Sequence, residues 1–145
     1  MKTLNEYIVN TQSDNMILEM ARVGWMGVGK DTQKYEIYIH TDDPGNVPHI
    51  HLRDYSTRGH EFETCISLVS AEYFLHGKYS DKMNNSLAKT FDNFMRAPSR
   101  NKKYNTNFEY AIDMWNDNNS STNIEAQFDD NGNIIIPDYT NINNS

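Results

Sequence analysis

The sequence predicts an α+β fold, with a small antiparallel sheet of about three to five strands and two or three short helices packed on one face. Three observations carry this prediction. Alternating apolar and polar residues in the first half of the chain are typical of half-buried strands. Apolar residues at helical spacing come after them. Because the strands precede the helices and do not alternate with them, a parallel, doubly wound sheet is disfavoured.

The strands are predicted in order along the chain. The stretch 16–29 contains three glycines, and we interpret it as a glycine-bearing strand or hairpin. A phosphate-binding loop is disfavoured there, because an Asp follows the Lys where Ser or Thr should hold magnesium. Residues 35–40 alternate between apolar and polar, as do 49–53 and 61–68. The Asp-Asp-Pro-Gly-Asn turn at 42–46 lies between the first two of these and favours antiparallel pairing.

Helices are predicted at three places. Capping boxes, in which Thr is followed three residues later by Glu, open a short helix over 4–10 and a longer one from Thr106. The apolar stripe of the longer helix runs to Trp115. A third helix is predicted over 87–95 from its apolar spacing, and Pro98 limits it.

We expect one domain, over 1–117, followed by an Asn-rich acidic segment over 118–145. A chain of 145 residues suits a single core. All 13 Lys and Arg lie at or before Lys103, so the excess that gives a net charge of −7 falls in 104–145. This distribution disfavours nucleic-acid binding by the C-terminal third. Within it, an Asp-Asn-Gly-Asn turn followed by three isoleucines over 134–136 predicts a hairpin strand.

The sequence also bears on where in the cell the protein is located. No apolar stretch is long enough for a transmembrane helix, and the N-terminus shows no signal peptide. The single cysteine, Cys65, cannot form an internal disulfide. We therefore expect a soluble cytoplasmic protein that does not interact with membranes.

The most informative pattern is His49-Ile50-His51. On a strand, His49 and His51 point to the same face. Antiparallel pairing across the preceding turn, with the isoleucines buried, places His40 on that face as well. If residues 61–67 add a further strand, Glu63 and Cys65 join the three histidines. Imidazoles beside carboxylates and a thiol suit zinc or another late transition metal.

Two interpretations of these residues stay open. In the first, a divalent transition metal is the cofactor, and its ligands are His40, His49 and His51. Glu63 is then the general base, and Arg53 binds the charge of a phosphate. In the second, the histidines have a structural role or are ordinary exposed side chains on the polar side of a sheet.

The remaining His and Cys residues receive no role at this point. Cys65 is expected to pack as a small apolar side chain. His60 and His76 are expected to lie outside any cluster.

A basic cluster without intervening acids lies just after the helix predicted over 87–95. Its members are Arg96, Arg100, Lys102 and Lys103. We interpret it as a solvated loop beside a proline, with binding of a phosphate or an acidic partner as the alternative.

The order of elements, together with the Pro48-His49-Ile50-His51 step, resembles small uncharacterised bacterial and phage proteins similar to DUF4160-like domains. In those proteins an acidic or Asn-containing turn precedes a Pro-His-x-His strand, and a Trp-bearing helix follows. The likeness covers residues 35–117. This chain departs from the pattern in its long N-terminal segment and its Asn-rich tail. The resemblance implies a toxin–antitoxin or defence-related context, and it implies no particular reaction.

Three functions follow as hypotheses. The first is a small bacterial or phage accessory protein that binds a partner protein or small molecule without turnover, because no complete catalytic motif is present. Its acidic C-terminal third could dock on a basic partner. The second is a metal-dependent phosphoester hydrolase or nuclease that uses the histidines. The third is a virion or assembly component.

Overall fold

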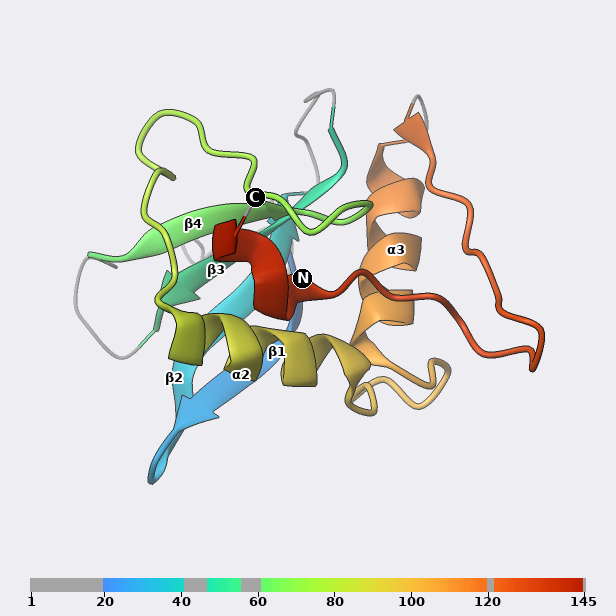
Figure 1. The fold of residues 1–145 in the computed structure, drawn as a ribbon, viewed down its shortest axis with the longest axis horizontal. Helices are drawn as coiled ribbons and strands as arrows, with labels where there is room; N and C mark the ends of the chain where they lie inside the picture. The colour runs from blue at the N-terminus through green and yellow to red at the C-terminus, as the bar shows by residue number, and fades with distance from the viewer. Residues whose placement is uncertain (1–19, 41–46, 56–60, 120–121, 145) are drawn as a thin grey trace, which may run out of the picture.

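The structure is a computed structural model that describes residues 20–40, 47–55, 61–119 and 122–144 (Figure 1). It confirms the α+β fold, with one antiparallel sheet and helices that follow it in the chain. The helix predicted over 4–10 lies outside the described residues. None of the helices in the described part is long and apolar enough to cross a lipid bilayer.

The strands lie in the sheet in the order in which they follow along the chain. They are β1 (Met20–Val28), β2 (Asp31–His40), β3 (His49–Asp54) and β4 (Glu63–Ser67).

The helices come after the sheet. They are α2 (Asn85–Arg96), α3 (Asn107–Asn118) and a C-terminal 3-10 helix, η2 (Tyr139–Asn144).

The described part of 16–29 forms one strand, β1, which is one of the two alternatives predicted for that stretch. β1 pairs with β2 as an antiparallel hairpin. Gly29 in the turn has a φ of 60°, in the left-handed region that glycine adopts without strain. Gly27 allows a close approach of the two strands, because a Cβ there would lie 2.8 Å from the carbonyl oxygen of Asp31.

The predicted pairing of 35–40 with 49–53 is confirmed, and so is its parity. Ile37 lies opposite Leu52, and both are fully buried in the apolar core. Tyr38 lies opposite His51, which in turn lies opposite Cys65 on β4. Because side chains alternate along a strand, the apolar and polar residues are separated onto opposite faces of the sheet.

We call the face of the sheet that carries the polar residues the polar face. The residues of the polar face that matter below are Tyr38, His40, His49, His51, Glu63 and Cys65.

The helices begin and end close to their predicted positions. α2 buries Phe91 and Met95 against the apolar side of the sheet and ends two residues before Pro98. α3 opens with the predicted capping box of Thr106 and Glu109, whose side chains bond each other's backbone N–H groups.

The tail after α3 returns to α2, against which η2 lies (Figure 1). Tyr139 is fully buried, and its backbone N–H donates to the Asp92 carboxylate at 2.9 Å. The strand predicted over 134–136 is reduced to one isolated bridge between Ile134 and Phe128. The tail is therefore held by side-chain contacts and a 3-10 turn, with hardly any sheet pairing.

One further segment completes the sheet. Residues 72–81, which we call the return segment, run antiparallel along the outer edge of β4. The N–H of Phe74 donates to the carbonyl of Cys65 at 3.0 Å, and the N–H of Asp81 donates to that of Glu63 at 3.2 Å. Between these two bonds the chain turns at Gly77, which has a φ of 53°.

Candidate metal centre

The polar face is buried except at its edge, where His40 is partly exposed. The exposed fraction is 1% for His49 and 0% for both His51 and Cys65. The expectation of exposed side chains is therefore wrong for His49 and His51, whereas it holds in part for His40. The physical reason for the burial is the turn of the return segment, whose aromatic rings cover this face. The ring of Tyr79, for example, lies 4.9 Å from the ring of His51. A structural role for these histidines stays a prediction.

Three side chains of the types that can bind a metal ion converge on this face. One donor atom from each of His49, Cys65 and His76 lies within 4.8 Å of the other two. The donors come from three separate segments, namely β3, β4 and the turn of the return segment. Two imidazole nitrogens and a sulfur suit zinc and similar transition metals, whereas magnesium and calcium prefer oxygen ligands.

Both histidines of this group are oriented by the backbone. His49 Nδ1 lies 2.8 Å from the carbonyl oxygen of Val47, and His76 Nδ1 lies 3.3 Å from that of Phe74. A carbonyl oxygen can only accept a hydrogen bond, so Nδ1 carries the proton in each ring. Nε2 then carries the lone pair that a metal requires. This orientation of the ring by a hydrogen bond from its second nitrogen is typical of metal-binding histidines.

His51 and Glu63 form a buried pair beside this group. His51 Nδ1 lies 3.1 Å from Glu63 Oε2, and the Tyr38 hydroxyl donates to the same oxygen. Burial lowers the pKa of His51 to about 4, although the hydrogen bond to Glu63 opposes this. Burial acts to raise the pKa of Glu63, but the hydrogen bonds from His51 and Tyr38 hold it below its usual value. At neutral pH the pair is a neutral imidazole and a carboxylate.

This geometry does not match a cysteine nucleophile activated by a His-acid pair. In such a site the acid and the nucleophile bind opposite nitrogens of the imidazole. Here Cys65 Sγ lies 3.2 Å from His51 Nδ1, the nitrogen that also faces Glu63. The arrangement therefore does not support a nucleophilic role for Cys65.

The sequence-predicted ligands are brought together in part. His49 belongs to the three-donor group, whereas His40 and His51 lie beside it. The His40 ring is 4.6 Å from the His51 ring and is partly exposed. Arg53, the predicted phosphate-binding residue, pairs with the buried carboxylate of Glu36 at 2.8 Å.

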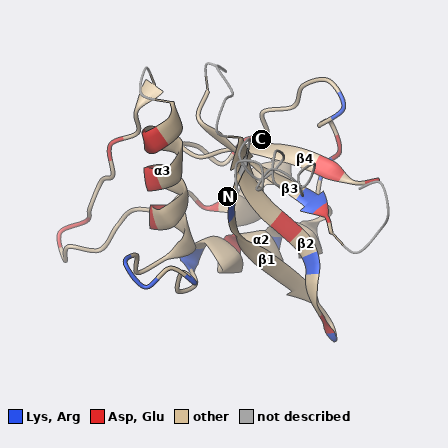
Figure 2. Cartoon of the chain, turned by 180° about the vertical axis from the view of Figure 1, so that it is seen from behind, with Lys and Arg blue, Asp and Glu red and all other residues tan. Residues whose placement is uncertain are grey.

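The predicted basic cluster divides into two pairs. Arg96 binds the Asp92 carboxylate and the Pro137 carbonyl, and Arg100 donates to the carbonyls of β1. These two arginines thus hold distant segments of the fold together. Lys102 and Lys103 are exposed on the loop between α2 and α3, which is blue in Figure 2, whereas α3 itself carries red acidic residues.

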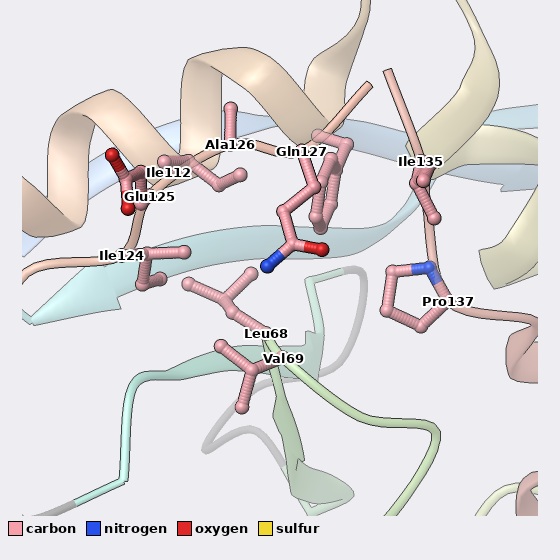
Figure 3. A pocket seen from close by; sticks show the side chains of 10 residues that line it. Leu68, Val69, Ile112, Ile124, Glu125, Ala126, Gln127, Ile135 and Pro137 are labelled. Atoms are coloured by element: carbon pink, nitrogen blue, oxygen red, sulfur yellow. The ribbon is translucent and has the colours of Figure 1, made fainter. Parts of the chain in front are cut away.

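A separate apolar recess lies between α3, the end of β4 and the tail (Figure 3). Its volume is about 290 Å³. Leu68, Ile112 and Ile124 line it, and the amide of Gln127 lies among them. This size and lining fit the apolar part of a small molecule.

Sequence reasoning missed one residue of the site. His76 was expected to lie outside any cluster, and that expectation is wrong because His76 joins the three-donor group. Its placement depends on the return of residues 72–81 along β4, which has no periodic signal in the sequence. The turn residue Gly77 next to it was the one local sign that the chain reverses there.

Comparison of the chain with protein-family models, with curated proteins and with solved structures found no match. The resemblance to DUF4160-like domains therefore stays a prediction. The interpretation of the site depends on its geometry.

Proposed function

We propose that this chain is a transition-metal-binding protein that holds one ion, with zinc as the best fit, through His49, Cys65 and His76. The observation that supports this most is the convergence of three donor atoms within 4.8 Å, from three separate segments. The backbone-oriented imidazoles of His49 and His76 add to it.

The separations between the three donor atoms are compatible with a site that contracts when it binds a metal ion. Zinc–nitrogen bonds of about 2.05 Å and a zinc–sulfur bond of about 2.3 Å place tetrahedral donors about 3.3 to 3.6 Å apart. Since the donors lie within 4.8 Å of one another, they need to approach by at most about 1.5 Å, from those bond lengths. His76 is the ligand best able to move, because it is partly exposed and lies in a turn.

The proposed role of the metal is to join β3, β4 and the return segment. Burial of His49 and Cys65 favours a closed, structural site, because catalytic zinc keeps a position open to water and substrate. The protein would then act by binding, as an accessory protein of a bacterial or phage-infected cell. In the reducing cytoplasm the single thiol stays available as a ligand.

The metal content of untagged protein, purified without chelator and measured by elemental mass spectrometry, tests the proposal. We expect close to one metal ion per chain in the wild type, and its loss in His49→Ala and His76→Ala. His40→Ala is the matched control, because its ring lies on the same face but outside the three-donor group. A folded wild-type protein that stays metal-free after addition of zinc contradicts the proposal. Loss of metal in His40→Ala instead points to the ligand set His40, His49 and His51.

A metal-dependent phosphoester hydrolase is the second candidate. Three protein ligands leave one position for water in a tetrahedral site, and the Glu63 carboxylate lies on β4 two residues from Cys65. The zinc-loaded protein should then cleave bis(p-nitrophenyl) phosphate, and Glu63→Gln should reduce the rate at least about a hundredfold, as for other general bases. Hydrolysis no faster than by free zinc removes this candidate.

A further inference from the structure

Two recesses lie side by side between α3 and the tail. The first is the apolar recess of Figure 3, with a volume of about 290 Å³, and the second has a volume of about 320 Å³. They share Ile112, Ile124 and Ala126, so they form one continuous surface, which we call the tail groove. We propose that the tail groove binds a basic amphipathic segment of a partner protein. This inference goes beyond the proposed metal site and does not depend on it.

The floor of the tail groove is apolar and continuous with the core. Phe108 and Ile112 of α3 line it together with Leu68, and all three are buried members of the apolar core. Two further apolar side chains of its lining, Val69 and Ile135, are 55% and 51% exposed. Large apolar side chains that stay exposed beside a recess mark a place where apolar groups of another molecule can be buried.

The groove is formed before any partner binds. The side-chain amide of Asn116 on α3 donates to the carbonyl of Ile124 at 2.8 Å, and its oxygen accepts the N–H of Ile124 at 2.7 Å. The N–H of Ile135 donates to the carbonyl of Gln127 at 2.8 Å. These bonds hold the tail against α3 and its two arms against each other. A partner therefore meets a fixed surface, and little free energy is spent on ordering it.

The charge of the groove favours a basic occupant. Glu109, Asp113 and Glu125 line it, whereas no Lys or Arg of the described residues does. The ion pairs among the described residues involve other acids. Glu109 and Asp113 accept hydrogen bonds only from neutral groups, of Thr106 and Tyr104 respectively. Acids without a cationic partner around an apolar floor complement a segment whose apolar side chains are flanked by Lys or Arg.

Fluorescence anisotropy with synthetic peptides tests the proposal on the full chain. The probe is a fluorescein-labelled helical peptide of Leu and Lys, with its leucines on one side. Two control peptides keep its length and replace either Leu by Ser or Lys by Glu. We expect saturable binding of the Leu–Lys peptide alone, equally with zinc and with chelator. Equal binding of the Ser–Lys peptide overturns the proposal, because charge alone then explains it. Absence of binding of the Leu–Lys peptide up to about 1 mM also overturns it.

Variants of exposed residues show whether the peptide lies in the tail groove. Val69→Ser combined with Ile135→Ser should weaken binding about tenfold, because two apolar contacts are lost. Val28→Ser is the matched control, since Val28 is 52% exposed at the end of β1 and outside the groove. Glu125→Gln should weaken binding about threefold at low salt, and Asp130→Asn, outside the groove, should not.

Two results with the double variant overturn the proposal. The first is an affinity for the Leu–Lys peptide equal to that of the wild type. The second is a wild-type dimer in sedimentation velocity that the double variant abolishes, because the occupant of the groove is then a second copy of this chain. Metal content is measured separately, so neither result bears on the proposed metal site.

Discussion

The two faces of β3 are both buried, but by different means. Ile50 and Leu52 point into an apolar core covered by α2 and α3, where burial needs no partner groups. His49 and His51 point to the polar face, where each ring nitrogen needs a hydrogen bond or a metal. The apolar face of this strand should therefore contribute stability that does not depend on pH or metal, whereas the contribution of the polar face should depend on pH and, if the proposed metal binds, on metal.

The largest effect should come from the apolar face. Phe91→Ala removes a fully buried ring that contacts Tyr139, and it should lower the free energy of unfolding by about 3 to 5 kcal/mol. Urea unfolding with and without chelator measures this loss, which should be equal in the two conditions. A loss that differs between them by more than about 1 kcal/mol contradicts the separation of the two faces.

The second-largest effect should come from acid, which lowers the free energy of unfolding through the polar face. The pKa of His51 is lowered by burial from 6.5 to about 4, so the unfolded chain takes up a proton at higher pH than the folded one. Stability is therefore fully present above pH 6.5 and is lost as the pH falls towards 4. The loss should be about 3 kcal/mol, from the size of the shift.

Chelated protein is the right sample for this measurement, because metal binding also depends on pH. Urea midpoints between pH 4 and 8 follow the loss. His51→Gln should flatten the profile between pH 4 and 6.5, and an unchanged slope in this variant contradicts the assignment to His51.

Metal binding at the polar face should raise the free energy of unfolding by a similar amount. Free zinc at a hundredfold excess over its dissociation constant should raise the free energy of unfolding by about 2.7 kcal/mol. His76→Ala removes a partly exposed ligand and should fold, but zinc should no longer raise its melting temperature. An equal rise in the variant and the wild type contradicts the assignment of His76 as a ligand.

The smallest losses in the free energy of unfolding should come from removing either of two buried hydroxyl groups. Tyr38→Phe removes a hydrogen bond to the Glu63 carboxylate and should cost about 1.5 to 3 kcal/mol. Tyr139→Phe removes one to the neutral carbonyl of Ser67 and should cost about 0.5 to 1.5 kcal/mol. Unfolding of both variants at pH 7 gives the two losses, and the reverse order contradicts the charged state of Glu63.

The sequence predicted the faces of residues in β2, β3 and β4 but not the burial of their polar side chains. Side-chain alternation is a local property, so the parity of His49, His51 and Cys65 followed from the pattern of isoleucines. The burial of these residues depends on where residues 72–81 lie, and that is decided by pairing with β4 and not by any local period. His76 was missed for the same reason.

The tail shows a second limit of local reasoning. The three isoleucines of 134–136 have strand propensity, yet the structure has only the bridge at Ile134. Arg96 of α2 donates to the carbonyls of Ile136 and Pro137 and thereby occupies backbone groups that a strand would need. Tertiary contacts thus override propensity there.

The return segment has a consequence for self-association. An uncovered edge strand offers a row of backbone N–H and C=O groups with which another chain can pair and aggregate. Residues 72–81 occupy that edge of β4, through the bonds of Phe74 and Asp81 to Cys65 and Glu63. If the metal fastens the turn of this segment, its loss uncovers the edge and the aromatic rings together. Metal supply would then control how readily the protein pairs with further copies through this edge and aggregates.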